Sequence, residues 1–190
     1  MDTALAEAFI HRTHQCCGFA LADFTLRHAF VLDALGSPCA LSGAGEIAIE
    51  DLYSAARICS TRNDEELQTV LDTLRPSTDA EKIEHLAALE ICRLDPLPHI
   101  IAWNAYLKDH VTLPRLMEVR GGGHWQNHPL LILAAKLMRH GHLSKRDAWW
   151  TGYGEARWLS LALDELDPNV KFELLSEARI EKLREKGHAV

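Results

Sequence analysis

The stretch FTLRHAFVLDALGSPCALSGAGEIAIEDLYSAARICS, residues 24–60, decides the fold class because it joins two helical segments through a loop rich in Gly, Ser and Pro. Thr25 can cap the first helix, and Gly36 can end it in a left-handed conformation. The polar residues between these ends are few: Arg27, His28 and Asp33. A helix that is apolar on most of its surface is buried, so we expect this one to lie inside a domain or an interface.

The second helix of this stretch, at about residues 50–60, has one clean apolar stripe. Its apolar residues follow the spacing i, i+3, i+4 and i+7: Leu52, Ala55, Ala56 and Cys59. Polar residues fall mainly on the opposite side, which is typical of a helix that packs against a core on one face. We therefore expect residues 24–60 to be the packing nucleus of the N-terminal half, or half of an interface.

Helical periodicity also recurs outside this stretch. The other expected helices cover residues 3–14, 63–76, 79–94, 100–108, 129–139, 144–150, 155–166 and 176–187. Asn63 and Pro129 are suited to begin helices, and Pro96 and Pro98 are expected to break the chain before residue 100. Strand patterns are short and occur at residues 46–49 and 170–174. The sequence therefore predicts an all-α fold, a compact multi-helix array of about nine helices.

The glycine run at residues 121–123 is the best candidate for a boundary along the chain. It separates an N-terminal helical half, residues 1–120, from a C-terminal helical half, residues 121–190, and we expect the two halves to form one integrated domain. A phosphate-binding loop needs GxxxxGK[ST] after a strand, whereas His124 and Trp125 follow these glycines. A hinge or a loop is therefore the favoured interpretation.

Composition limits the partners and the compartment. The 190 residues have a formal net charge of −7, with 47% hydrophobic and 25% charged residues, as in an ordinary folded chain. The basic residues at 139–146 are read as a solvated helix end, so no nucleic-acid partner is expected. No apolar run is long enough to span a bilayer and no signal-peptide pattern is present, so we expect no membrane association and a cytoplasmic location.

Histidines and cysteines near the N-terminus are the candidates for metal or nucleophilic chemistry. The residues that lie close together are His11, His14, Cys16 and Cys17. Zinc needs about four converging ligands, and neither CxxC nor HExxH occurs in the chain. A cysteine nucleophile beside His14 would need an orienting group as well, and sequence neighbours alone do not make a triad. The five cysteines are odd in number and irregularly spaced, which favours free thiols in a reducing compartment.

Two further groups of polar residues give no stronger signal. His124 and His128 are four residues apart, but Pro129 and the glycine run argue against a preformed helical pair. The carboxylate pairs are Glu65 with Glu66 and Asp164 with Glu165. These pairs are expected on solvated helix surfaces. We therefore expect no catalytic residue, no cofactor-binding residue and no metal site.

All five tryptophans fall in the second half of the chain, at Trp103, Trp125, Trp149, Trp150 and Trp158. Aromatic residues supply large buried areas and often anchor interfaces. A partner-binding surface around residues 149–158, which include Tyr153, is one interpretation. The favoured one is the core of the C-terminal half, because the helix that carries Trp158 must itself bury an apolar face.

The stretch at residues 24–60 resembles a pattern in small proteins encoded beside the tail genes of tailed phages and prophages. Its progression is a leucine-rich helix, then Gly-Ser-Pro, then an acidic residue followed by Leu, then Ile-Cys-Ser. The later segment SKRDAWWTGYGEARWLSLALDE, residues 144–165, is similar to their C-terminal portion, in which a turn of small residues precedes an aromatic-rich helix. The resemblance implies a morphogenesis protein, such as a tail assembly chaperone that keeps a hydrophobic tape-measure chain soluble.

The expected function is therefore a non-catalytic phage or prophage assembly protein in the host cytoplasm. It would act through contacts with protein partners such as a phage tail protein, and a homo-oligomer is compatible with this role. Two alternatives remain open. One is a structural virion component or a self-assembling adaptor, and the other is a small metal- or cysteine-dependent enzyme.

Overall fold

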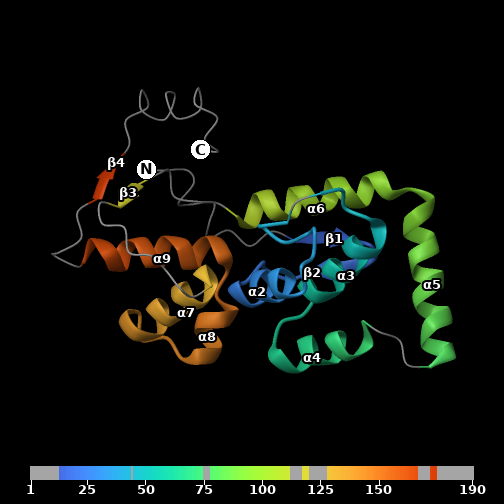
Figure 1. The fold of residues 1–190 in the computed structure, drawn as a ribbon, viewed down its shortest axis with the longest axis horizontal. Helices are drawn as coiled ribbons and strands as arrows, with labels where there is room; N and C mark the ends of the chain where they lie inside the picture. The colour runs from blue at the N-terminus through green and yellow to red at the C-terminus, as the bar shows by residue number, and fades with distance from the viewer. Residues whose placement is uncertain are drawn as a thin grey trace. The chain divides into compact units, whose positions relative to one another are not determined.

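The computed structural model describes residues 13–43, 45–74, 78–111, 117–119, 128–166 and 172–174, and most of them are helical (Figure 1). The helices are α2 (Leu26–Ala34), α3 (Ile49–Cys59), α4 (Asp64–Thr73), α5 (Asp79–Leu94), α6 (Pro96–His110), α7 (Pro129–His140), α8 (Lys145–Trp150) and α9 (Tyr153–Glu165). The predicted predominance of helix is confirmed. The described residues contain eight helices, against about nine expected for the whole chain. The helix expected at residues 176–187, and all but the end of that expected at 3–14, lie outside them.

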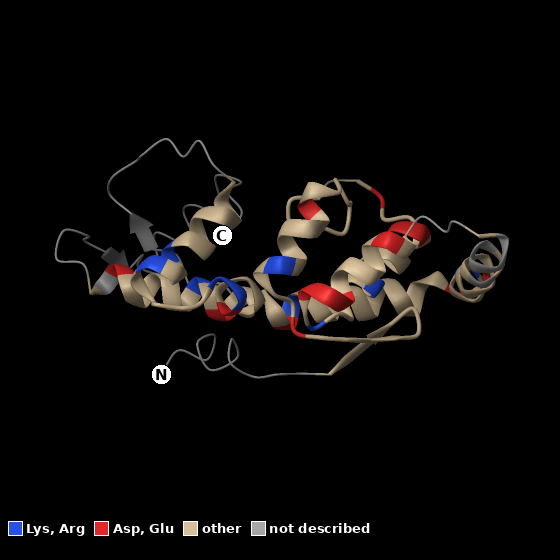
Figure 2. Cartoon of the chain, turned by 90° about the horizontal axis from the view of Figure 1, so that it is seen from below, with Lys and Arg blue, Asp and Glu red and all other residues tan. Residues whose placement is uncertain are grey.

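The chain divides into two compact units. The hairpin unit comprises His11–Val111 and Trp149–Tyr153, and the C-terminal unit comprises Met1–Ile10, Thr112–Ala148 and Gly154–Val190. The expected boundary near residue 120 stays a prediction. Among the described residues, no helix is both long enough and apolar enough to cross a membrane. Lys and Arg are interspersed with Asp and Glu along the described helices (Figure 2).

The helix ends follow the local sequence. The Thr25 hydroxyl accepts a hydrogen bond from the backbone N–H of His28, and the His28 side chain accepts one from the N–H of Thr25, which completes a capping box. Gly36 follows α2 with φ of 64°, the left-handed conformation predicted for it. The side chain of Asn63 caps α4 by accepting from the N–H of Glu66. These three predictions are confirmed.

A break before α6 is present as predicted, but the helix expected at residues 100–108 begins earlier, at Pro96. Pro96 and Pro98 lie in the first turn of α6, which runs from Pro96 to His110. N–H groups in the first turn have no partner within the helix, so a proline there loses no intrahelical bond. Asp95 precedes α6, and α5 turns into α6 at this residue.

A β-hairpin near the N-terminus was not predicted. Strand β1 (His14–Cys16) pairs antiparallel with β2 (Phe19–Leu21) through a turn at Cys17 and Gly18, whose φ angles are 50° and 83°. The strand expected at residues 46–49 is wrong, since residues 46–48 form no strand and Ile49 begins α3. Within the expected strand at 170–174, β4 (Phe172–Leu174) pairs with β3 (Met117–Val119).

The core of the hairpin unit forms around α3. This helix contacts α2, α4, α5, α6 and β2, and its predicted stripe is buried together with Tyr53 and Ile58. Figure 1 shows α6 along the side of the hairpin, opposite α2 and α4. Other large side chains that are fully buried in this unit are Phe24, Leu26, Leu32, Leu67, Trp103 and Tyr106. The packing nucleus expected in residues 24–60 is therefore the centre of this core.

The segment Trp149–Tyr153 adds to this core. The N–H of Leu26 donates to the Thr151 carbonyl at 3.1 Å, and the N–H of Tyr153 donates to the Phe24 carbonyl at 2.7 Å. The ring of Trp149 lies 5.2 Å from the ring of Phe30. Trp149 and Trp150 thus pack against α2 in the hairpin unit, rather than in a separate C-terminal core. Trp158 belongs to the C-terminal unit, and Trp125 lies outside the described residues.

Candidate functional site

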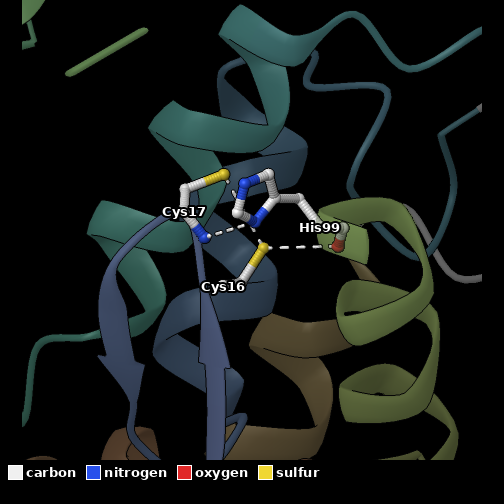
Figure 3. Close-up of side chains that lie close together, drawn as sticks. All are labelled: Cys16, Cys17 and His99. Carbon is white, nitrogen blue, oxygen red and sulfur yellow. Dashed lines mark hydrogen bonds between the residues drawn. The ribbon is translucent and has the colours of Figure 1, made fainter. Parts of the chain in front are cut away.

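Two cysteines and one histidine meet where the hairpin contacts α6 (Figure 3). Cys16 ends β1, Cys17 begins the hairpin turn, and His99 lies near the start of α6. Their candidate ligand atoms all lie within 4.8 Å of one another. The three residues are the one group with metal-ligand geometry among the parts of the chain that the structure describes.

Hydrogen bonds connect the three residues. The Sγ atoms of Cys16 and Cys17 are 3.8 Å apart, and Cys16 Sγ lies 3.5 Å from the carbonyl oxygen of His99. The backbone N–H of Cys17 donates to Nδ1 of His99 at 3.3 Å, although the two residues are 82 positions apart in the sequence. The neutral His99 ring in this arrangement carries its proton on Nε2. The ring lies beside both sulfur atoms (Figure 3).

A fourth soft side chain lies close to this group. Cys92, in the last turns of α5, is a buried thiol near enough to Cys17 for each to shift the pKa of the other, but its sulfur lies outside the set of ligand atoms that are all within 4.8 Å of one another. Cys16 and Cys17 are buried as well, and all five cysteines of the chain are free thiols. We call Cys16, Cys17, Cys92 and His99 the thiol cluster.

The thiol cluster is poorly suited to nucleophilic catalysis. The hydrogen bond with Cys16, followed by burial, raises the pKa of Cys17 well above its usual value, and burial raises the pKa of Cys92 to about 11. A thiol attacks as its thiolate, so a raised pKa at neutral pH keeps these groups unreactive. Thiolate and imidazole groups gathered in a buried site are instead the ligands that soft metal ions prefer.

The histidines weighed from the sequence have other partners. His14 Nε2 lies 3.1 Å from an Asp109 carboxylate oxygen, and its ring is 5.6 Å from that of Tyr106. His14 therefore fastens β1 to α6 rather than joining the thiol cluster. His128 caps α7 by accepting from the N–H of Leu130, while His11 and His124 lie outside the described residues.

One carboxylate of each pair weighed from the sequence has a structural partner. Glu66 accepts hydrogen bonds from the N–H of Arg62 and from the side chain of Asn63, at the start of α4. Asp164 forms an ion pair with Lys136. These carboxylates therefore stabilise helix ends and helix packing in their own units.

His28 is a fully buried ionisable group of the hairpin unit. Its Nδ1 lies 3.3 Å from the backbone nitrogen of Thr25 and 3.1 Å from the carbonyl oxygen of Asp23, and its Nε2 lies 3.1 Å from the carbonyl oxygen of Thr61. The tautomer of the neutral ring decides which of the two nitrogens donates its proton. Burial lowers the pKa of His28 to about 4. This histidine is neutral at physiological pH and holds α2 to the end of α3.

A second feature is an apolar surface on α5 and the first half of α6. Among the described residues, six of the ten large hydrophobic side chains that are exposed lie on these two helices: Ile83, Leu86, Ile91, Leu94, Leu97 and Ile101. On α5, the first four recur at helical spacing on one side, opposite the buried residues Leu89 and Cys92. We call these six residues the apolar face.

Sequence reasoning singled out Cys16 and Cys17 as candidates, but it identified neither their partners in the thiol cluster nor the apolar face. His99 stands alone in a proline-rich segment, and Cys92 has no neighbouring histidine or cysteine that would signal a ligand pair. The spacing Ile83, Leu86, Ile91 and Leu94 was visible as a helix face, but the natural expectation was that this face would be buried. Comparisons with protein-family models, with curated proteins and with solved structures found no match for this chain.

Proposed function

We propose that this chain is a non-catalytic assembly protein that binds an apolar helix of a phage tail protein on its apolar face. One observation carries the proposal, namely the concentration of exposed large hydrophobic residues on α5 and α6. Leu94 is 85% exposed and Ile91 is 70% exposed, which is costly unless a partner covers them.

The shape of this surface favours a helix as the partner. The four residues on α5 lie on one side of the helix, within an arc of about 140° at 100° per residue. A stripe of this kind packs against a second amphipathic helix by ridges and grooves. The phage setting is supported by the sequence resemblance alone, and the tape-measure chain is the client that this resemblance implies.

The opposite side of α5 supports the helix while the apolar face stays exposed. Leu89 and Cys92 are buried, and Arg93 forms ion pairs with Glu50 on α3 and with Glu90. Arg93 does not obstruct a helix that docks on the apolar face, because its side chain is paired with Glu50 on α3. Helix α5 is thus attached to the hairpin unit by one side and can present the other.

The test is co-expression of the full chain with the tape-measure protein encoded in the same genome. In the variant Ile91→Asp/Leu94→Asp, two charges enter the apolar face, and recovery of the soluble client should fall roughly tenfold or more. The matched control is Leu166→Asp, because Leu166 is 80% exposed but belongs to the C-terminal unit. Circular dichroism of each variant should remain that of the parent chain.

Two results would overturn the proposal. One is equal client recovery by the Ile91→Asp/Leu94→Asp variant and the parent chain. The other is a parent chain that self-associates in light scattering and loses this association in the variant, with no effect on the client. That second result would assign the apolar face to a self-assembling adaptor.

A further inference from the structure

We propose that Cys16, Cys17, Cys92 and His99 form a tetrahedral zinc-binding site that joins the β1–β2 hairpin to α5 and α6. The site is independent of the apolar face and of any client. Three of the proposed ligands, Cys16, Cys17 and His99, already have their ligand atoms within 4.8 Å of one another, and Cys92 would complete the set by moving in from the last turns of α5.

The sulfur atoms already have the spacing that zinc requires. Tetrahedral zinc binds sulfur at about 2.3 Å, which places two sulfur ligands about 3.8 Å apart. The Sγ atoms of Cys16 and Cys17 are 3.8 Å apart. The nitrogen ligand of His99 lies within 4.8 Å of both, so a contraction of about 1 Å would bring it to the distance that a shared zinc ion sets.

The backbone of Cys17 creates this spacing. Neighbouring residues of a regular strand point to opposite faces, so adjacent cysteines would normally separate their sulfur atoms. Cys17 instead has φ of 50°, a left-handed conformation that residues with a side chain rarely adopt. The turn therefore directs both thiols toward α6, at a conformational cost of roughly 1 kcal/mol or more. Asn, Asp or Gly would fill this turn position more cheaply, and a ligand role accounts for a cysteine there.

Cys92 and His99 stand on either side of the bend at Asp95. Cys92 lies in the last turns of α5 and His99 near the start of α6. His99 accepts a hydrogen bond from the Cys17 N–H in the hairpin turn, and the Cys92 thiol is near enough to interact electrostatically with that of Cys17. Structural zinc sites have four cysteine or histidine donors in tetrahedral geometry, and three cysteines with one histidine is one of their usual sets. Zinc bound here would fix the angle between α5 and α6, and with it the hairpin.

The donor set selects the metal. Three thiolates and one imidazole favour zinc over magnesium or calcium, which prefer oxygen ligands. Binding requires that each thiol release its proton, because the thiolate is the metal ligand. Zinc would also take the Nδ1 lone pair that now accepts the N–H of Cys17, or bind the other ring nitrogen after a change of tautomer.

The experiment uses the full chain, purified under reducing conditions without chelator. Zinc would be measured by mass spectrometry of the metal content, with about one ion per chain expected. Cobalt chloride added to the metal-free chain should give the intense absorption of cobalt–thiolate bonds and the visible bands of tetrahedral cobalt. This spectrum tests the parent chain directly, so the result does not depend on how any variant folds.

Variants then assign the ligands. Cys17→Ser and His99→Gln should each weaken cobalt binding by at least about tenfold, because even loss of an outer-shell partner costs about 10- to 100-fold. The matched control is Cys59→Ala, since Cys59 is a buried thiol that interacts with Tyr106 outside the thiol cluster. It should bind cobalt as the parent does. Absence of the cobalt–thiolate absorption in the parent chain, or its full retention in Cys17→Ser, would overturn the proposal.

Discussion

Single residues explain how α2 is held in the core. Thr25 and Gly36 have the roles that the sequence predicts, because capping and left-handed termination depend on residues next to the helix end. The role of His28 could not be predicted, since its second partner, Thr61, is 33 positions away. A polar residue on an otherwise apolar helix was visible, but the hydrogen bonds that satisfy it depend on the tertiary fold.

His28 makes the stability of the chain depend on pH. Its pKa is about 4 in the folded chain, against 6.5 for an ordinary histidine, because burial disfavours the charged form. Between these pH values the unfolded chain binds a proton here that the folded chain does not. The free energy of unfolding should therefore decrease by up to about 3 kcal/mol as the pH falls through this window. At pH values above the window, His28 should make no pH-dependent contribution. Asp23 raises the pKa of His28, and His110 lowers it.

The variant His28→Gln isolates this contribution. Glutamine at this position can still accept from the N–H of Thr25, as in an ordinary capping box, but it does not titrate. Urea denaturation at several pH values from about 7 to about 4 covers the range in which His28 titrates in the unfolded chain but not in the folded one. As the pH falls, the variant should lose less stability than the parent chain. An identical pH dependence in both would contradict the neutral, buried state of His28.

At the scale of elements, helix type was predictable and the hairpin was not. Every described helix except α8 has nine residues or more, whereas β1 and β2 have three residues each. Their turn, Cys17-Gly18, has none of the usual asparagine or aspartate at its first position. The pairing of these strands therefore depends on contacts with α3 and α6 rather than on a local signal.

The prolines of α6 permit a test of helix position. Pro96→Ala should change the stability by less than about 1 kcal/mol, because residue 96 is the first of the helix and its N–H needs no helical partner. Ile101→Pro should cost about 3 kcal/mol or more, because residue 101 lies inside α6, although its side chain is 59% exposed. Chemical denaturation measures both. Equal, small losses in the two variants would mean that the helix begins after residue 101.

At the scale of the whole molecule, the hairpin unit is discontinuous in sequence. The segment Trp149–Tyr153 belongs to it, although most of the unit ends at Val111. No local sequence pattern indicates that residues 149–153 pack in the same unit as residues 11–111. The aromatic content of residues 149–158 was recognisable from the sequence, but the unit that buries Trp149 and Trp150 was not.

The variant Leu52→Ala tests this division of the chain. Leu52 is fully buried in α3, and its truncation should destabilise the hairpin unit by about 2–5 kcal/mol. Hydrogen exchange followed by mass spectrometry should then accelerate at residues 149–153, whose Tyr153 N–H bonds to Phe24, more than in α7 of the C-terminal unit. Acceleration in α7 alone would contradict the assignment of this segment to the hairpin unit.

The central claim is that the apolar face of α5 binds an apolar helix of a partner protein. The most direct measurement is site-specific photocrosslinking, with a photoreactive amino acid at Leu94 in the full chain and, as the control, at Leu166. Both side chains are at least 80% exposed, and they lie in different units. We predict that position 94 crosslinks to a helical, apolar segment of the co-expressed tape-measure protein and that position 166 does not. Equal crosslinking from both positions, or none from position 94 while the complex is intact, would contradict the account.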